Sequence, residues 1–363
     1  MTTPVTPLSA LAAIISSNVK SLEAAYATHG ADFPSLDDPF RPTPLDFDPT
    51  LHQTKALIVA AAAQILASVR SPIETLQEYA PGMYWTATLG FVVDANIPDI
   101  LNEGGPENPT KAAAPFNIAH KTEAKMWEWY EEPGNEWRSR RFSAAMKGGI
   151  ERYPGELFVN GVGCKYLKDD DVLVDVGGSV GSCVLHLYKA YPNLRYVVQD
   201  LPKQITAAAE FWMKNAPEAV PNGKVTLQGK LGIIMPVKGA AVYFLRVIIH
   251  DWPDHDAKTI LRHLRDAADD SSKLVLFDTL AFHVCDNPDA ESAAPKAPVP
   301  TPLLANLGVA GAGFDTGMDI QMLNLFNGKE RTEAEFRELG IFTGWKLESI
   351  IRGPLATFTF SAV

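Results

Sequence analysis

The stretch 172–181, with the sequence VLVDVGGSVG, constrains the fold of this chain more than any other. Apolar residues surround Asp175 as in a buried strand, and the amphipathic run 182–188 after the turn predicts a helix. The turn between them holds three glycines, Gly177, Gly178 and Gly181. Small residues let a ligand approach the backbone, and a helix N-terminus offers free N–H groups, so this order is typical of a nucleotide-type site. A glycine turn alone also occurs where a helix merely packs on a strand, and by itself it is weak support.

A second predicted strand, 194–198, leads to Asp200. An acidic residue about 20 residues after such a turn is placed to bind the two hydroxyls of a ribose. Strand and helix patterns then alternate, which predicts an α/β fold with a doubly wound parallel sheet. Strands are expected at 172–176, 194–198, 224–228, 240–246 and 273–278, with helices at 181–191, 203–215, 255–268, 319–326 and 332–339. The β runs 345–351 and 356–361 flank Gly353-Pro354 and predict a terminal antiparallel hairpin.

The first 150 residues carry helical rather than alternating patterns. Helices are expected at 7–30, 51–69, 73–79, 85–101, 116–130 and 135–148. A breaker-rich segment at 102–114 separates the fourth helix from the fifth. We therefore expect a helical N-terminal domain at 1–114, linking helices at 115–150 and a Rossmann-like domain at 151–363. The Pro- and Ala-rich stretch 286–313 predicts a surface loop.

Composition limits the partners of this chain. With 32 Lys and Arg against 43 Asp and Glu, the net charge of -11 argues against a general nucleic-acid or anionic-membrane binder. Three cysteines, Cys164, Cys183 and Cys285, form no CxxC pair, so neither a metal site nor a disulfide framework is predicted. A reducing, cytoplasmic location fits this pattern. No signal-peptide layout is present, and the longest apolar run, 56–67, is too short to span a bilayer.

Polar residues follow the predicted strands at their carboxyl ends, where ligands bind in open α/β sheets. Asp200 follows the second strand, Arg246 and His250 the fourth, and Asp278 the fifth, while Glu330 follows the helix at 319–326. A histidine with nearby carboxylates is a standard general-base arrangement. The alternative for His250 is a helix-capping or core histidine. The absence of a GxSxG motif argues against a serine hydrolase.

An aromatic set in the stretch 116–130 allows two interpretations. Its members are Met126, Trp127, Trp129 and Tyr130. They form either a core stripe or, in part, the roof over a flat, apolar substrate.

Four motifs, VDVGGSVG, VVQDLP, FLRVIIHDWPD and NGKERTEAEF, occur in this order. Together they resemble the plant-type and fungal S-adenosylmethionine-dependent O-methyltransferases that act on small phenolic molecules, from about Phe116 to the C-terminus. The resemblance implies S-adenosyl-L-methionine as cofactor and methyl transfer to a hydroxyl of a small aromatic or secondary-metabolite acceptor. It implies His250 as the catalytic base, with Asp278 and Glu330 as the two acidic residues beside it.

The same resemblance implies the residues that hold the two ligands. For the cofactor it implies Asp175, Gly177, Gly178 and Gly181 at the turn, Asp200 on the ribose, Leu201, Lys230 and Leu231 around the adenine, and Arg246 for the carboxylate. For the substrate it implies a pocket that includes Trp127, Trp252, Met322 and Asn324.

Three departures from the family pattern stand out. Ser179 replaces a glycine, a mild change provided that its φ is negative. Lys230 stands where the family has an aspartate that grips the adenine, and an ammonium group cannot accept that hydrogen bond. Most of the family's winged-helix unit looks absent, which leaves dimerisation and the substrate lid open. Two alternatives remain beside methyl transfer: a pericyclic or cyclisation enzyme that uses donors such as Lys329 or His250, and a non-catalytic protein of the same fold.

Overall fold

A computed structural model describes residues 6–34, 45, 48–79, 82, 115–151, 153–229, 236–282, 313–353 and 355–363. The chain forms two compact units, Met1–Ala80 and Pro81–Val363. Each unit is described by itself. The expected helix at 85–101, the segment 102–114 and the loop at 286–312 lie outside the described residues.

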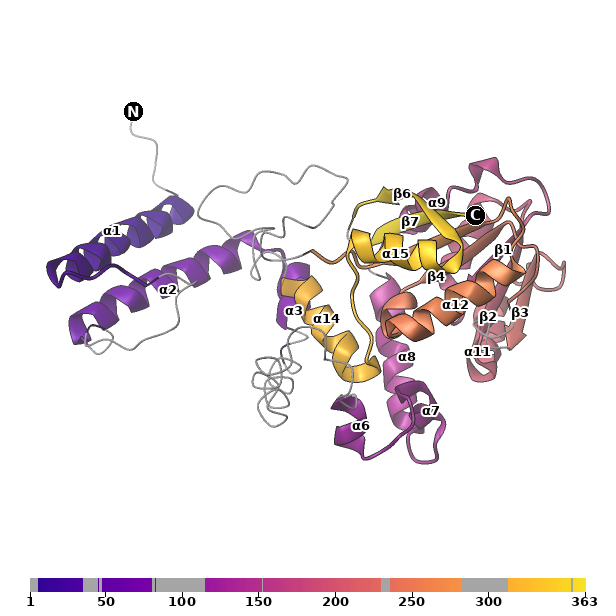
Figure 1. The fold of residues 1–363 in the computed structure, drawn as a ribbon, viewed down its shortest axis with the longest axis horizontal. Helices are drawn as coiled ribbons and strands as arrows, with labels where there is room; N and C mark the ends of the chain where they lie inside the picture. Colours follow the sequence, from indigo (N-terminus) through magenta and orange to yellow (C-terminus); the bar gives the residue numbers. More distant parts are fainter. Residues whose placement is uncertain are drawn as a thin grey trace. The chain divides into compact units, whose positions relative to one another are not determined.

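The first unit consists of helices α1 (Pro7–Thr28), α2 (Pro49–Val69) and α3 (Pro72–Tyr79) (Figure 1). Thr6 starts α1 because its side chain accepts a hydrogen bond from the backbone N–H of Ser9 at 3.2 Å. Leu22 and Tyr26 of α1 are buried with Leu51 of α2, which packs the two helices together. Among the described residues, none of the helices combines the length and apolar character that a bilayer crossing needs.

The second unit is built on a seven-stranded sheet with the order β3-β2-β1-β4-β5-β7-β6. The strands are β1 (Val172–Val176), β2 (Arg195–Asp200), β3 (Val225–Gly229), β4 (Val242–Arg246), β5 (Lys273–Asp278), β6 (Trp345–Ile351) and β7 (Ala356–Ala362). The first five are parallel, while β7 pairs antiparallel with both β5 and β6. The predicted doubly wound sheet with a C-terminal antiparallel hairpin is therefore confirmed.

Strand order places the ligand crevice of this sheet. Asp175 of β1 lies opposite Val198 of β2 on one side and Phe244 of β4 on the other. The chain winds outward in one direction from β1 to β3 and in the other from β4, so the order reverses between β1 and β4. Open α/β sheets bind ligands beyond the strand ends at such a reversal.

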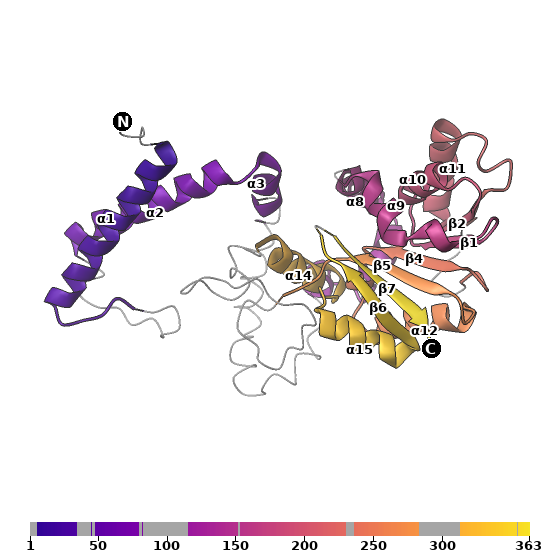
Figure 2. The same ribbon diagram turned by 90° about the horizontal axis from the view of Figure 1, so that it is seen from above.

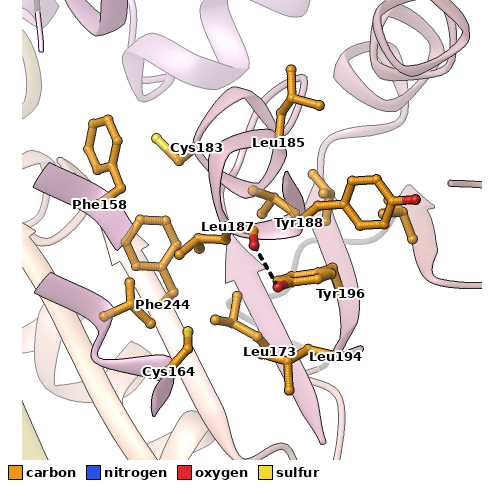
Figure 3. Packing of buried hydrophobic residues seen from close by; sticks show 14 of the residues in the cluster. Phe158, Cys164, Leu173, Cys183, Leu185, Leu187, Tyr188, Leu194, Tyr196 and Phe244 are labelled. Carbon is orange, nitrogen blue, oxygen red and sulfur yellow. Dashed lines mark hydrogen bonds between the residues drawn. The ribbon is translucent and has the colours of Figure 1, made fainter. Parts of the chain in front are cut away.

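Helices cover both faces of the sheet (Figure 2). One face carries α9 (Gly155–Val162), α10 (Ser182–Ala190) and α11 (Pro202–Asn215), and the other carries α12 (Asp254–Ala267) and α15 (Glu333–Thr343). Alternation along β1 produces two cores, since Leu173 belongs to the first cluster and Val174 to the second. In the first cluster the Tyr196 hydroxyl donates to the Leu187 carbonyl at 3.0 Å and so remains satisfied inside an apolar environment (Figure 3).

The linking region differs from its prediction. The stretch 116–130 is not one helix but two, α6 (Pro115–His120) and α7 (Met126–Glu131). Lys121 interrupts them with a φ of 50°, and the Asn117 side chain donates to the carbonyls of Thr122 and Ala124 in the break. The apolar spacing continues through this turn, and for this reason the sequence predicts a single helix over 116–130. Beyond it lie α8 (Glu136–Glu151), the unpredicted α9 and, near the C-terminus, α14 (Gly313–Phe326).

Candidate active site

The glycine turn joins β1 to α10 and is anchored to β2. The backbone N–H groups of Gly177 and Gly178 both donate to the Gln199 carbonyl, at 2.9 and 3.2 Å. Gly177 has a φ of 73°, and a Cβ there would lie 2.6 Å from Cδ1 of Ile248. Only glycine fits both the conformation and the contact. The turn therefore packs directly on the segment that leads from β4 to His250.

Ser179 adopts a φ of 52°, so the condition under which its substitution would be mild is not met. A side chain in the left-handed region costs about 1–2 kcal/mol relative to the right-handed one. The Ser179 N–H donates to Oδ2 of Asp200 at 2.7 Å, and the Leu201 N–H donates to Oδ1 at 2.6 Å. The strained turn thus holds the Asp200 carboxylate in a fixed orientation at the end of β2.

Asp175 and Arg246 share the electrostatic environment of this turn. Asp175 is 2% exposed, and burial raises its pKa to about 7. The positive charge of Arg246 opposes this rise, and the negative charge of Asp200 adds to it. Three predicted cofactor residues from β1, β2 and β4 therefore lie close enough to influence one another.

Val247 redirects the chain after β4. It has a φ of 54°, which is rare for a β-branched residue, and its N–H donates to the Phe277 carbonyl at 2.7 Å. The chain then enters a short 3₁₀ turn, η4 (Ile249–Asp251), which carries His250. Such strain is often found where a backbone must present a functional side chain.

His250 lies at the centre of a buried cluster of acids and is itself 4% exposed. Its Nδ1 is 2.9 Å from Oε1 of Glu330 and 3.5 Å from Oδ1 of Asp278, while Nε2 is 3.4 Å from Oδ1 of Asp251. Three segments distant in sequence supply these groups. The structure thus brings together the three residues predicted for catalysis, His250, Asp278 and Glu330, and adds Asp251.

The cluster changes the acidity of its members. Burial alone would lower the pKa of His250, but the carboxylates of Glu330, Asp278 and Asp251 outweigh it and raise the pKa to about 10. Burial raises the pKa of Asp251 to about 7 and that of Asp278 to about 6. At neutral pH the free protein therefore holds a protonated imidazole among carboxyl groups.

A cavity of about 240 Å³ adjoins Asp251. Pockets for drug-sized ligands span roughly 300–1,000 Å³, so this one suits a smaller molecule. Trp127, Trp252 and Phe326 line it, and the Trp127 ring stacks on Phe326 with centroids 5.2 Å apart. Lys125 lies over the Trp252 ring and forms an ion pair with Asp256 at 2.8 Å. Aromatic rings and polar side chains thus line the cavity together. Asp251, whose carboxyl group contacts the buried histidine, is one of the lining residues, whereas His250 is not.

Not every predicted site residue reaches this cavity. Of the predicted substrate residues, Trp127 and Trp252 line it, whereas Met322 is buried in α14 and neither Met322 nor Asn324 is among its lining residues. Lys230 and Leu231 lie outside the described residues. The Lys329 ammonium is engaged by Glu335 at 2.7 Å and Asp254 at 3.1 Å, not by the cavity.

Sequence reasoning missed Asp251 and Phe326. Asp251 is adjacent to His250 in the HDW motif, and this adjacency is the signal in the sequence that marks it. Phe326 offered only an apolar position at a helix end, and its place opposite Trp127 depends on tertiary packing.

The chain belongs to the O-methyltransferase domain family, whose family model matches residues 162–346. This range contains the glycine turn, Asp200, Arg246 and the whole His250 cluster.

Fungal proteins resemble this chain in sequence. An O-methyltransferase of Armillaria gallica is 28% identical over 461 aligned positions, which cover 96% of this chain and 97% of the relative. That alignment is longer than the 363 residues here, so the relative has segments that this chain lacks. The 4-O-methyltransferase 1 of Phanerochaete chrysosporium is 34% identical over 244 residues, 66% of this chain and 51% of the relative. The O-methyltransferase tpcA of Aspergillus fumigatus is 38% identical over 183 residues, 50% of this chain, and the match spans only 36% of the relative.

Solved structures share the fold at low identity. LaPhzM gives a TM-score of 0.54 at 17% identity and covers 98% of this chain and 96% of its own. The mitomycin 7-O-methyltransferase MmcR gives 0.52 at 20% identity, with 96% and 84% covered. LepI, solved in complex with SAM, gives 0.51 at 22% identity, with 97% and 86% covered. These likenesses establish the architecture.

Proposed function

We propose that this protein is an S-adenosylmethionine-dependent O-methyltransferase that transfers a methyl group to a hydroxyl of a small aromatic or secondary-metabolite acceptor. Family membership supports the class of reaction. The observation that carries the proposal is the position of His250. Its Nδ1 lies near the carboxylates of both Glu330 and Asp278, and its turn packs, through Ile248, against the glycine turn.

The residues around the glycine turn fit the cofactor. Each oxygen of Asp200 accepts one backbone N–H and keeps a lone pair for a ribose hydroxyl. A Cβ at Gly178 would clash with the Asp175 carboxyl group, so the turn requires glycine at this position. Arg246 would hold the cofactor carboxylate. When bound, the cofactor supplies a methyl group on a sulfonium cation.

His250 would accept the proton of the acceptor hydroxyl. Glu330 contacts Nδ1, so the remaining nitrogen, Nε2, lies on the side of Asp251, a residue that lines the cavity. A phenol has a pKa of about 10, and the pKa of His250 is raised to about 10, so transfer between them is nearly balanced. The carboxylates of Asp278 and Asp251 then stabilise the imidazolium that forms. Trp127 and Trp252 would orient a flat ring for in-line attack.

Three measurements test the proposal. A thermal-shift titration with S-adenosylmethionine and S-adenosylhomocysteine should raise the unfolding temperature, and no shift at millimolar cofactor would contradict an active methyltransferase. The product mass should increase by one methyl group per acceptor, whereas an isomer of equal mass would indicate a cyclisation. His250→Ala should slow transfer about 10²–10⁴-fold with near-normal cofactor binding. Equal loss of binding and turnover would show that the role of His250 is wrong.

A further inference from the structure

Arg331 is 1% exposed and follows Glu330 directly in the chain. Its guanidinium donates through Nη1 to the Ile249 carbonyl at 2.8 Å and through Nη2 to the Trp252 carbonyl at 2.8 Å. Nε and Nη2 also donate to Oδ1 of Asp254, at 3.1 and 2.8 Å. The Arg331 side chain is therefore hydrogen-bonded to the backbone on both sides of His250.

The backbone of the same segment lies against the histidine turn. The Lys329 N–H donates to the His250 carbonyl at 3.1 Å. A Cβ at Gly328 would clash with that carbonyl oxygen, so the chain at this position approaches as closely as backbone atoms allow. The segment 328–331 and η4 thus form one packed unit.

Arg331 also reaches the third element of the cluster. Its carbonyl accepts the Ala281 N–H at 3.0 Å, and Leu280 forms a parallel bridge with it. Both contacts lie just after β5, which ends at Asp278. Arg331 is therefore bonded to, or adjacent to, every segment that supplies a member of the cluster.

We propose that Arg331 is a positioning residue, whose guanidinium fixes the turn of His250 in register with Glu330 and Asp278. The inference rests on the proposed function of His250. A planar guanidinium bridges two carbonyls and a carboxylate at once, whereas a lysine ammonium is a point charge on a flexible chain and does not reproduce this fork. Loss of the fork leaves buried carbonyls unpaired and frees the turn to shift.

The charge of Arg331 has a second effect. Its positive charge lowers the pKa of Asp278 and so opposes the effect of burial. The charged and titratable groups facing His250 are Asp251 on its own turn, Asp278 at the end of β5, and Glu330, while Arg246 acts on Asp251. Removal of the cation at 331 favours protonation throughout this cluster.

Two variants separate geometry from charge. Arg331→Lys keeps the charge and loses the fork, and Arg331→Met loses both. Arg337, which is half-exposed and pairs with Glu333 at 3.0 Å, supplies the matched controls Arg337→Lys and Arg337→Met. We expect kcat to fall about tenfold in Arg331→Lys and about a hundredfold in Arg331→Met, because small misplacements of a reacting group carry penalties of this order. Cofactor Kd should stay near wild type. In a plot of kcat against pH, the rise of kcat with increasing pH should move to higher pH in Arg331→Met only.

The titration of the His250 ring, followed by NMR and assigned with His250→Gln, provides a readout that needs no substrate. We expect its pKa to rise in Arg331→Met and its ring resonances to change in both Arg331 variants. If both variants match their Arg337 counterparts in kcat and in the ring resonances, the inference is overturned. If Arg331→Met does not fold, Arg331→Lys alone decides. If the wild type transfers no methyl group, the proposed function fails, and the ring resonances still decide whether Arg331 positions His250.

Discussion

Oε1 of Glu330 lies 2.9 Å from Nδ1 of His250, although 80 positions separate the two residues in the chain. Both are buried, so removal of either partner would leave the other polar group in an environment that penalises it. The contact sets the orientation of the imidazole and leaves Nε2 on the side of Asp251. The orientation of the ring is thus set by a residue from the C-terminal part of the chain.

The pH dependence of turnover should reflect the raised pKa of His250. A base must be unprotonated to act, and its carboxylate neighbours raise this pKa to about 10. We expect kcat/KM to rise about tenfold per pH unit from pH 7 and to level off near pH 10. Initial rates at saturating cofactor, with the acceptor's own ionisation measured separately, provide the check. A plateau already reached at pH 7 would contradict a raised pKa in the free enzyme.

Glu330→Gln should shift the rise of kcat/KM with pH to lower pH. The amide can still accept the Nδ1–H hydrogen bond but carries no charge, so the imidazolium loses stabilisation and its pKa falls. We expect the plateau rate to drop about tenfold or more as well, because the charge that forms on the ring is less well stabilised. Glu338→Gln on α15 serves as a control, since Glu338 is not a member of the cluster. A rise that does not move would mean that Glu330 does not tune His250.

Stability should decrease as the pH rises from 6 to 9. The folded-state pKa of His250 is raised to about 10, so its contribution is complete below its unfolded pKa of about 6.5 and is lost as pH approaches 10. The pKa values of Asp251 and Asp175, raised to about 7 by burial, act in the same direction, but only below about pH 7. Thermal unfolding at constant ionic strength measures the effect, and His250→Gln should show a shallower slope. A flat or rising profile would contradict the prediction.

Ser179→Gly should stabilise the protein. The left-handed conformation of Ser179 costs about 1–2 kcal/mol, and a glycine loses about 0.5–1 kcal/mol more entropy on folding, so we expect a net gain of up to about 1.5 kcal/mol. Ser179→Ala keeps the Cβ and should show no gain. Urea unfolding measures both variants. Equal stability of the glycine and alanine variants would show that φ is not the source of the strain.

Asp200→Asn should weaken cofactor binding. The carboxylate is held by the N–H groups of Ser179 and Leu201, and one carboxylate oxygen is replaced by an amide that cannot accept them. Hydrogen bonds to charged groups contribute about 1.5–3 kcal/mol, so we expect a Kd for S-adenosylhomocysteine about 10- to 100-fold higher. Calorimetry measures it, with the fully exposed Asp270→Asn as the control. An unchanged Kd would place the ribose elsewhere.

Much of the fold was predictable because buried parallel strands are short apolar runs. The strands that end at Val176, Asp200 and Arg246 stand out for this reason, and parallel strands place their following residues at one edge. His250 follows β4 and Asp278 ends the neighbouring strand β5, so their proximity was predictable from this arrangement.

Other features depend on tertiary contacts that no local pattern contains. The positive φ values of Ser179 and Val247 are unexpected for their residue types, and the N–H group of each donates to a residue of another strand. The contact of Asp251 with the cavity depends on the strained turn after β4. These elements needed the structure because neighbours distant in sequence impose them.

Pairing of β7 between β5 and β6 has a consequence for biosynthesis. Asp278 stands on a strand whose outer edge stays uncovered until residues 356–362 have left the ribosome, and Glu330 arrives only shortly before them. A growing polypeptide can therefore assemble its nucleotide-type crevice before residue 330 is added, while the cluster around His250 is completed only after it. Nonsense truncations before residue 330 should yield chains in which the His250 cluster lacks Glu330.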